Sequence, residues 1–270
     1  YIIVVAMNRK HSAYRAKAFL FKYPKRTIIQ IISFAFFIIL VFFVIGPHWV
    51  HTICPLAFFE SPLLSLLKGT RIFWLAGIIL GASATASTII IPRPFCGWVC
   101  PVGFVADIFG ELGERLHINA KRIPHWLNER MRYFSYGVLI FIVVGTVATE
   151  RLFCLVGCPV YWSCNAFTMS APPVTLVLLL FFVFVSLRVR RGFCRYICPF
   201  GALMGVFVPL SRYKVRLNLE VCKNCYVCRV CPMGIDITRE LTVKSSHCIS
   251  CNECVLSCPL NALYWGRRNL

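Results

Sequence analysis

Two cysteine-rich blocks in the last quarter of the chain carry the residue types and spacing best suited to chemistry. The first block reads CKNCYVCRVCP over residues 222–232, and the second reads CISCNECVLSCP over residues 248–259. A C-x2-C-x2-C loop supplies three thiolates to one face of an iron–sulfur cubane, and the fourth thiolate comes from the other block in two-cluster ferredoxins. The blocks therefore predict two [4Fe–4S] clusters in a small α+β domain of the bacterial 2[4Fe–4S] ferredoxin type.

The same rule divides the eight cysteines between the two clusters. One cluster takes Cys222, Cys225, Cys228 and Cys258, and the other takes Cys248, Cys251, Cys254 and Cys231. In the first block two residues separate the third cysteine from the Cys-Pro pair, whereas in the second block three do. The crosswise assignment of Cys231 therefore departs from the usual pattern. Structural zinc is the alternative, because paired C-x2-C motifs also bind zinc, although zinc sites rarely use triple runs that end in Cys-Pro.

A second kind of cysteine motif, F-C-x3-C-P, occurs twice at a spacing of 98 residues. Because the two cysteines of each motif are four positions apart, we expect them to share one face of a helical turn. Packing of two repeats about a local two-fold would then form a four-thiolate site for a metal ion or a further cluster. Its members are Cys96, Cys100, Cys194 and Cys198. Redox-active thiols, and plain packing of small apolar side chains, remain alternatives.

The elements that must position these cysteines are apolar helices. The chain is 59% hydrophobic, against ~45–50% in typical soluble domains. Four apolar segments are expected to cross the ~30 Å hydrocarbon core as helices, at ~1.5 Å per residue. They are residues 27–46, 72–91, 133–149 and 172–187. We therefore expect an α-helical membrane protein with four transmembrane helices arranged as two helix-pair repeats.

The chain divides into three regions on this interpretation. Residues 1–26 form a basic tail, residues 27–211 form the four-helix transmembrane domain, and residues 212–270 form the ferredoxin domain. Residues 213–219 alternate in the manner of a strand and are expected to open the ferredoxin domain. Residues 1–6 precede a methionine and are interpreted as an upstream extension or a fragment of the chain.

The distribution of positive charge follows membrane topology. The net charge of +19 would suggest a nucleic-acid partner in a soluble protein. Here the two loops on one side hold only Lys68, Arg71 and Arg151 of the 29 Lys and Arg residues. The positive-inside rule then places both termini and the ferredoxin domain on the cytoplasmic side of a prokaryotic inner membrane, with no nucleic acid bound. The basic run at residues 188–191 is interpreted as a lipid-headgroup anchor.

Four further cysteines lie in the two outward-facing loops. They are Cys54, Cys154, Cys158 and Cys164. An oxidising compartment favours disulfides between such residues. A cofactor site on the outer face is the alternative.

The motifs CGWVCP at residues 96–101 and CRYICP at residues 194–199, followed by the two C-terminal blocks, carry a family resemblance. The chain resembles the NapH-type membrane ferredoxins associated with periplasmic nitrate reduction, and more distantly the NosR and CcoG proteins. The resemblance covers nearly the whole chain. It implies a membrane electron-transfer subunit that takes electrons from quinol and passes them toward a periplasmic redox partner.

The expected function is that of an iron–sulfur electron-transfer subunit, or quinol dehydrogenase, acting between the quinone pool and a partner redox protein. The expected partners are other subunits of a membrane redox complex, such as a periplasmic ferredoxin or cytochrome. Candidate proton acceptors at the quinone site are His48, His51 and Glu60 on the outer face and Asp107 on the inner face. The alternative is a membrane maturation factor that reduces or assembles the metal cofactor of another enzyme.

Overall fold

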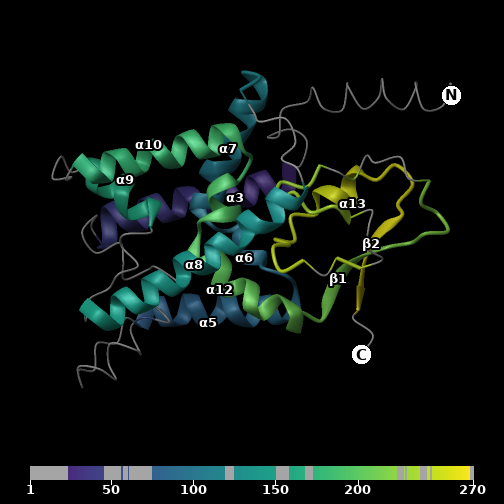
Figure 1. Cartoon of the computed structure of the whole chain (residues 1–270), viewed down its shortest axis with the longest axis horizontal. Coiled ribbons are helices and arrows are strands. Elements are labelled where there is room, and N and C mark those ends of the chain that lie inside the picture. The colour runs from purple at the N-terminus through teal and green to yellow at the C-terminus, as the bar shows by residue number, and fades with distance from the viewer. Residues whose placement is uncertain are drawn as a thin grey trace.

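The computed structural model has a helical part and, beside it, a small C-terminal part with two strands (Figure 1). It describes residues 24–45, 56, 60, 75–118, 125–149, 158–167, 173–223, 228, 230–237, 242–243 and 245–267. The longest helices are α3 (Pro24–Ile39), which a π-helix (Leu40–Ile45) continues, α5 (Leu75–Ile90), α8 (His125–Thr149) and α10 (Pro173–Arg188). The other helices are α6 (Pro94–Trp98), α7 (Pro101–Arg115), α9 (Pro159–Phe167), α11 (Gly192–Tyr196), α12 (Pro199–Phe207) and a 3-10 turn (Val208–Leu210).

The four predicted apolar segments coincide with the four longest helices. Helix α8 begins at His125, eight residues before the predicted residue 133. The added turns contact the C-terminal part, because Asn128 and Arg132 donate hydrogen bonds to the carbonyl of Gly234, at 3.2 and 3.0 Å. Among the described helices, α8 alone is both long and apolar enough to cross a membrane, over Trp126–Thr149. The arrangement of four transmembrane helices therefore stays a prediction.

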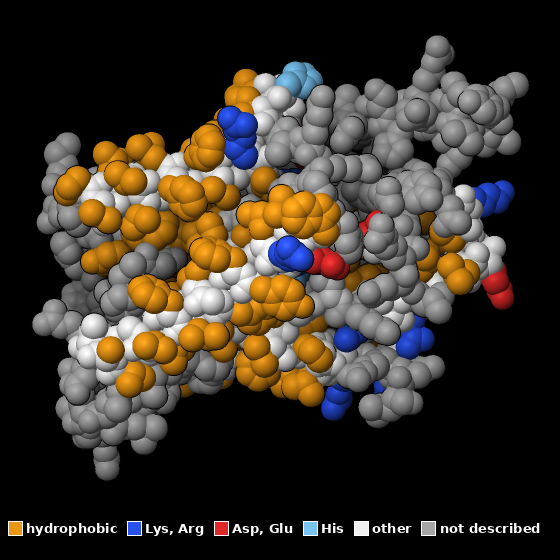
Figure 2. Space-filling view, in the orientation of Figure 1, with side chains coloured by type: hydrophobic (Ala, Val, Ile, Leu, Met, Phe, Trp, Pro, Cys, Tyr) orange, Lys and Arg blue, Asp and Glu red, His pale blue; other side chains and the backbone are white. Residues whose placement is uncertain are grey.

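The surface of the helical part is apolar. Figure 2 shows hydrophobic side chains covering the helices on the visible face, with few charged side chains among them. Phe36 of α3, Ile140 of α8 and Leu180 of α10 are 64%, 63% and 60% exposed. A contiguous exposed apolar surface of this kind marks contact with a membrane or with another protein.

The internal repeat contains more helices than the sequence indicated. Each half runs from a long helix (α5 or α10) through a five-residue helix (α6 or α11) into a further helix (α7 or α12). The turn before each five-residue helix is made by an arginine with left-handed backbone, Arg93 at φ 41° and Arg191 at φ 54°. Since that conformation is unfavourable for residues with a Cβ, its presence at both equivalent positions shows that the two halves share one local structure.

The two halves of the repeat interlock. Helix α7 of the first half packs against α10 of the second half, and α12 of the second half packs against α5 of the first half and against α8. The first contact is close, because a Cβ on Gly113 of α7 would overlap the backbone of Leu187 in α10. The interlocking brings the starts of α7 and α12 toward each other.

The C-terminal part has its own small core. Strand β1 (Tyr213–Leu217) pairs antiparallel with β2 (Leu263–Arg267), with Leu217 opposite Leu263. Val215, Leu217 and Leu263 are buried together with Val243, and the short helix α13 (Glu253–Ser257) lies beside them. The predicted opening strand is therefore confirmed, although it ends at Leu217.

A buried ion-pair network joins the two parts. Asp107 of α7 accepts hydrogen bonds from Arg191 (Nη2 to Oδ2, 2.6 Å) and from Arg26 of α3 (Nη2 to Oδ2, 2.7 Å). Glu253 of α13 pairs with Arg26 and with Arg190, whose Nη2 lies 2.8 Å from Oε1. Three guanidinium groups and two carboxylates thus hold α3, α7, the α10–α11 turn and the second cysteine block together.

For Arg190 and Arg191, this network corrects the interpretation of the basic run at residues 188–191 as a lipid-headgroup anchor, whereas Arg188 is exposed. The side chains of Arg190 and Arg191 are only 16% and 1% exposed. Both are drawn into ion pairs with acids that lie far away in the sequence, Glu253 at 63 positions and Asp107 at 84 positions. A local count of basic residues cannot reveal partners at that separation.

Replacement of Asp107 by asparagine should strongly destabilise the fold. The change leaves Arg26 and Arg191 buried with one carboxylate fewer, and breaking a buried ion pair typically costs about 3–5 kcal/mol. Unfolding of the detergent-solubilised protein would measure the loss. The matched control on the same helix is Glu111→Gln, whose partner Arg115 is 58% exposed, and it should change the unfolding free energy by less than ~1 kcal/mol. Equal effects of the two variants would contradict the role given to the network.

Candidate functional site

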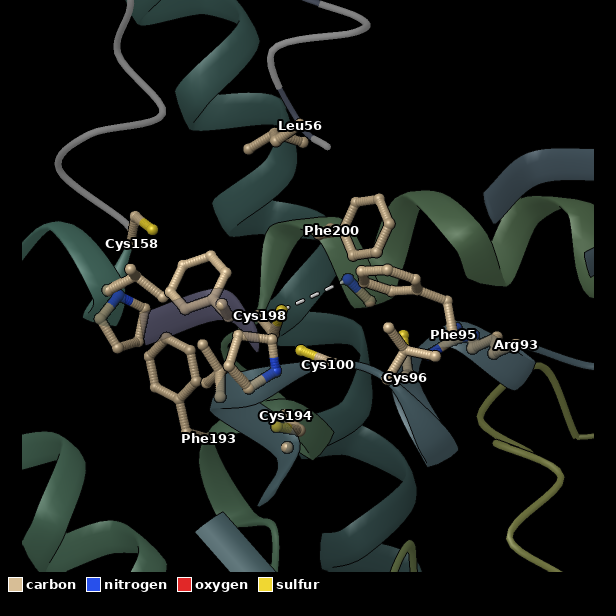
Figure 3. A pocket seen from close by; sticks show the side chains of 18 of the residues that line it. Leu56, Arg93, Phe95, Cys96, Cys100, Cys158, Phe193, Cys194, Cys198 and Phe200 are labelled. Atoms are coloured by element: carbon tan, nitrogen blue, oxygen red, sulfur yellow. Dashed lines mark hydrogen bonds between the residues drawn. The ribbon is translucent and has the colours of Figure 1, made fainter. Parts of the chain in front are cut away.

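One cavity of about 260 Å³ is lined by all four cysteines of the C-x3-C-P motifs. Figure 3 shows the side chains of Cys100 and Cys198 near the middle of the cavity, with those of Cys96 and Cys194 at other places on its wall. Each of the four thiols is within electrostatic range of the other three. The interlocked repeats therefore bring together the four residues that the sequence singled out.

The two cysteines of each motif do not share one helical turn, contrary to the prediction. Cys96 lies within α6, whereas Cys100 precedes α7 with extended backbone, at φ −61° and ψ 119°. Cys194 and Cys198 repeat this arrangement, and Cys198 has φ −60° and ψ 113°. The reason is the proline that follows each second cysteine, because a residue before proline is excluded from helical backbone. The Cys-Pro pair thus breaks the helix and redirects the thiol into the cavity.

Backbone amides at the helix starts point at the second thiol of each motif. The N–H of Gly201 donates to Cys198 Sγ at 3.4 Å, and the N–H groups of Val102 and Gly103 donate to Cys100. The positive end of a helix favours negative charge at the thiol. These N–H groups would therefore stabilise the negative charge of the Cys100 and Cys198 thiolates that form when a metal cation replaces the thiol protons.

Burial keeps the same thiols protonated when no cation is bound. It raises the pKa of Cys96 and of Cys198 to about 12 each, and it also raises the pKa of Cys100 and of Cys194. Reactive cysteines need the opposite, a lowered pKa that yields thiolate at neutral pH. Of the three interpretations of these cysteines, redox-active thiols fit worst, and either packing or metal binding fits better.

A fifth cysteine, Cys158, also lines the cavity. The sequence assigned it to the outer set, but Cys158 immediately precedes α9 and interacts electrostatically with Cys100 and Cys198. The signal was present in the sequence, because Cys158-Pro159 is the same Cys-Pro pair that ends both motifs. Cys54 and Cys154 lie outside the described residues, as does the side chain of Cys164.

The second ferredoxin block rests directly on the first C-x3-C-P motif. Met233 and Ile249 of the C-terminal part line the cavity, and they pack with Cys96 in one apolar cluster. Trp98 of α6 donates its indole N–H to the carbonyl of Ser250 at 3.0 Å. Gly97 is required at this contact, because a Cβ there would overlap the carbonyl of Ile249.

The thiols of the ferredoxin blocks also accept backbone N–H groups. Ala262 donates to Cys258 Sγ at 3.3 Å, and similar bonds reach Cys231, Cys248, Cys251 and Cys254. Hydrogen bonds to sulfur are typical of iron–sulfur sites, where they tune the reduction potential. Cys225 lies outside the described residues. Within the ranges given above, no three Cys, His, Asp or Glu side chains are grouped as ligands of one metal ion.

The candidate proton acceptors have different surroundings. Burial by itself would raise the pKa of Asp107, but the guanidinium groups of Arg191 and Arg26 outweigh it and hold that pKa below its usual range. Asp107 therefore stays ionised within the network and is poorly placed to take up a proton. Glu60 is buried, and its backbone N–H bonds the carbonyl of Leu56, which lines the cavity. His48 and His51 lie outside the described residues.

Comparison with known families finds iron–sulfur domains in three segments. A family described as a 4Fe-4S binding domain matches residues 70–119 and again residues 171–218. A second family with the same description matches residues 241–264. The first two segments each contain one C-x3-C-P motif, so the match supports the internal repeat.

Several proteins are similar over most of the chain. The chain is 31% identical to YccM of Escherichia coli over 192 residues, which cover 68% of this chain and 54% of YccM. It is 35% identical to an uncharacterized protein of Methanocaldococcus jannaschii over 180 residues, or 65% of this chain and 73% of that protein. It is 31% identical to the ferredoxin-type protein NapH of Escherichia coli over 176 residues, or 62% of this chain and 59% of NapH. No solved structure matches the chain.

Replacement of Gly97 by alanine should loosen the contact between α6 and the second ferredoxin block. The added Cβ meets the Ile249 carbonyl, and overpacking of this kind typically costs about 1–3 kcal/mol. Faster hydrogen–deuterium exchange in residues 248–257 would report it. Gly137→Ala on α8 is the control, because a Cβ there meets nothing within 4 Å. Unchanged exchange in both variants would mean that the described contact is not tight.

Proposed function

Because the chain belongs to the NapH-type family of 4Fe–4S proteins, which is related to NosR, we propose that it is an integral-membrane subunit exchanging electrons between the quinone pool and a partner redox protein. The chain is an iron–sulfur electron-transfer protein, as its 4Fe–4S binding segments and its ferredoxin-type relatives indicate. The membrane location, the quinone, the partner and the number of clusters form the proposal.

One observation carries this proposal, namely the docking of a ferredoxin block against an apolar-surfaced helical part. The contact is specific, since it combines the buried pairs of Glu253 with Arg26 and Arg190 and the close approach of Gly97 to Ile249. A ferredoxin domain that only diffused between partners would not need such an attachment. Its fixed position next to helices with exposed apolar side chains fits electron exchange at a membrane.

The eight cysteines of the two blocks are proposed to hold two [4Fe–4S] clusters in the crosswise arrangement. The ligand sets are Cys222, Cys225, Cys228 and Cys258 for one, and Cys248, Cys251, Cys254 and Cys231 for the other. The thiol set and the backbone N–H groups that reach it fit such clusters. When bound, the clusters supply one-electron oxidation and reduction.

The helical part is proposed to span the inner membrane four times, over residues 27–46, 72–91, 133–149 and 172–187. The exposed apolar side chains of α3, α8 and α10 would then be covered by lipid, without a second protein to bury them. The domain boundaries at residues 26 and 211 follow from this arrangement. Both termini and the ferredoxin domain would then lie on the cytoplasmic side.

A quinone is proposed to reach the protein from the bilayer through the mouth of the cavity. Phe36 and Val99 line the cavity and are also 64% and 42% exposed, so its wall continues into the apolar surface. The apolar mouth at Phe36 and Val99 is typical of sites for ligands of this class, and the quinone is proposed to bind there, apart from the cysteines deeper in the cavity. Glu60, next to the lining residue Leu56 through its backbone, is proposed as the proton acceptor in quinol oxidation.

Mixing the anaerobically purified protein with a soluble quinol analogue tests this function. Quinol should reduce the clusters, as followed by electron paramagnetic resonance, and Glu60→Gln should slow the reduction by at least ~100-fold, the usual contribution of a general base. Iron content should be the same in both proteins. A sample with full iron content that quinol does not reduce would reject the quinone role. Equal rates of cluster reduction in the wild type and in Glu60→Gln would reject Glu60 as the proton acceptor but leave the quinone role standing.

A further inference from the structure

Two buried arginines occupy equivalent positions in the repeat and border the cysteine cavity. Arg93 and Arg191 both line the cavity, and each is 1% exposed. Each reaches across to the opposite half. The guanidinium of Arg191 lies against Gly103 at the start of α7, and that of Arg93 lies against Gly201 at the start of α12. The pair therefore follows the local two-fold of the repeat.

The two halves of the repeat differ in whether a carboxylate lies beside the buried arginine. Arg191 is paired with Asp107 at 2.6 Å. The position equivalent to Asp107 in the second half is Gly205, and a Cβ there would overlap the guanidinium of Arg93. The space that a carboxylate fills in the first half is thus filled by Arg93 itself in the second half.

Arg93 is left without a counter-charge among the residues that the structure describes. Its Nε and Nη2 are buried without a hydrogen-bond partner there, and none of the ion pairs between described residues includes it. A buried charge without a partner is strongly unfavourable, and a bound anion beside Arg93 would compensate it.

The surroundings of Arg93 indicate the kind of anion that is missing. Arg93 lines the same cavity as the four motif cysteines, and its guanidinium interacts electrostatically with Cys96, Cys198, Tyr136 and Cys248. The cysteine side chains carry negative charge when iron replaces their protons. A cluster held by four thiolates supplies such negative charge in a site that two cysteines from each half complete.

We propose that the cavity binds a third iron–sulfur cluster and that Arg93 is the cation that compensates its charge. The proposed ligands are Cys96, Cys100, Cys194 and Cys198, which line this one cavity and would have to move closer together on binding, since the described side chains are not grouped at metal-ligand distances. The cavity volume of about 260 Å³ is far greater than the ~10–15 Å³ that one water molecule needs, so it has room for a polynuclear centre. The site is separate from the eight ferredoxin cysteines and extends the proposed electron path into the helical part.

The contact with the ferredoxin block gives this site a neighbour for electron exchange. Cys96 packs in one apolar cluster with Met233, Ile249 and Cys251, and Cys251 belongs to the ligand set of the second ferredoxin cluster. Arg93 interacts electrostatically with Cys96 and also with Cys248. Its charge is therefore expected to influence the potentials of both sites.

Iron and acid-labile sulfide in the anaerobically purified full chain test the third cluster. The wild type should hold about twelve irons, and Cys100→Ser combined with Cys198→Ser should hold about eight, four per cubane lost. Cys158→Ser is the matched control, since Cys158 lines the same cavity without being a proposed ligand, and it should keep all the iron. The resonance signals of the ferredoxin clusters must persist in every variant, which shows that the fold is intact.

Other outcomes of this measurement overturn the proposal. About eight irons in the wild type, both as purified and after reconstitution with iron and sulfide, would mean that the cavity holds no cluster. Co-extraction of a quinone together with that result would identify the quinone as the occupant. Loss of iron from Cys158→Ser equal to that of the double variant would assign the ligands differently.

The role of Arg93 is tested by the reduction potential of the third cluster. Arg93→Gln should lower that potential by at least about 59 mV, which is tenfold in a one-electron equilibrium, because a positive charge favours the reduced state. Arg93→Lys should largely retain the wild-type potential. Arg188→Gln is the control, because Arg188 does not line the cavity. A potential that is the same in the wild type and in Arg93→Gln would reject Arg93 as the compensating cation.

Discussion

The structure depends on the buried pairing of three arginines with two acids. Arg26, Arg190 and Arg191 meet Asp107 and Glu253 where the start of α3, the middle of α7, the α10–α11 turn and the second ferredoxin block come together. Charges withdrawn from water are tolerated only when each finds its partner. The network therefore permits few other positions for these elements. Since Glu253 lies between Cys251 and Cys254, the same pairs also fix the position of the second cysteine block.

Proline supplies the second constraint, which acts locally. Cys100 and Cys198 are forced out of helical backbone by the proline that follows each of them. The five-residue helix before each Cys-Pro pair and the longer helix after it therefore meet at an angle with a thiol at the junction. The same device precedes α9 at Cys158. Three helices thus start at one cavity, and at two of them, α7 and α12, backbone N–H groups point toward a cysteine sulfur.

The repeat is structurally symmetric but electrically asymmetric. Arg93 and Arg191 share backbone conformation, burial and position. One has an acid, Asp107, and the other faces Gly205. Duplication of a unit preserves backbone geometry, whereas a single substitution changes the charge of one half. Excess positive charge next to the thiols is well suited to a negatively charged ligand in the cavity.

The sequence by itself determined the cysteine chemistry, the four long helices, the internal repeat and the strand at Tyr213–Leu217, because spacing and periodicity act over a few residues. It also contained the Cys-Pro pairs that redirect the thiols. Only the tertiary structure decided that Cys158 borders the inner cavity, that Asp107 belongs to an ion-pair network, and that Arg190 and Arg191 are buried. These features depend on partners up to 227 positions apart, as for Arg26 and Glu253. Pairing at that range is a property of packing, which no local pattern in the chain encodes.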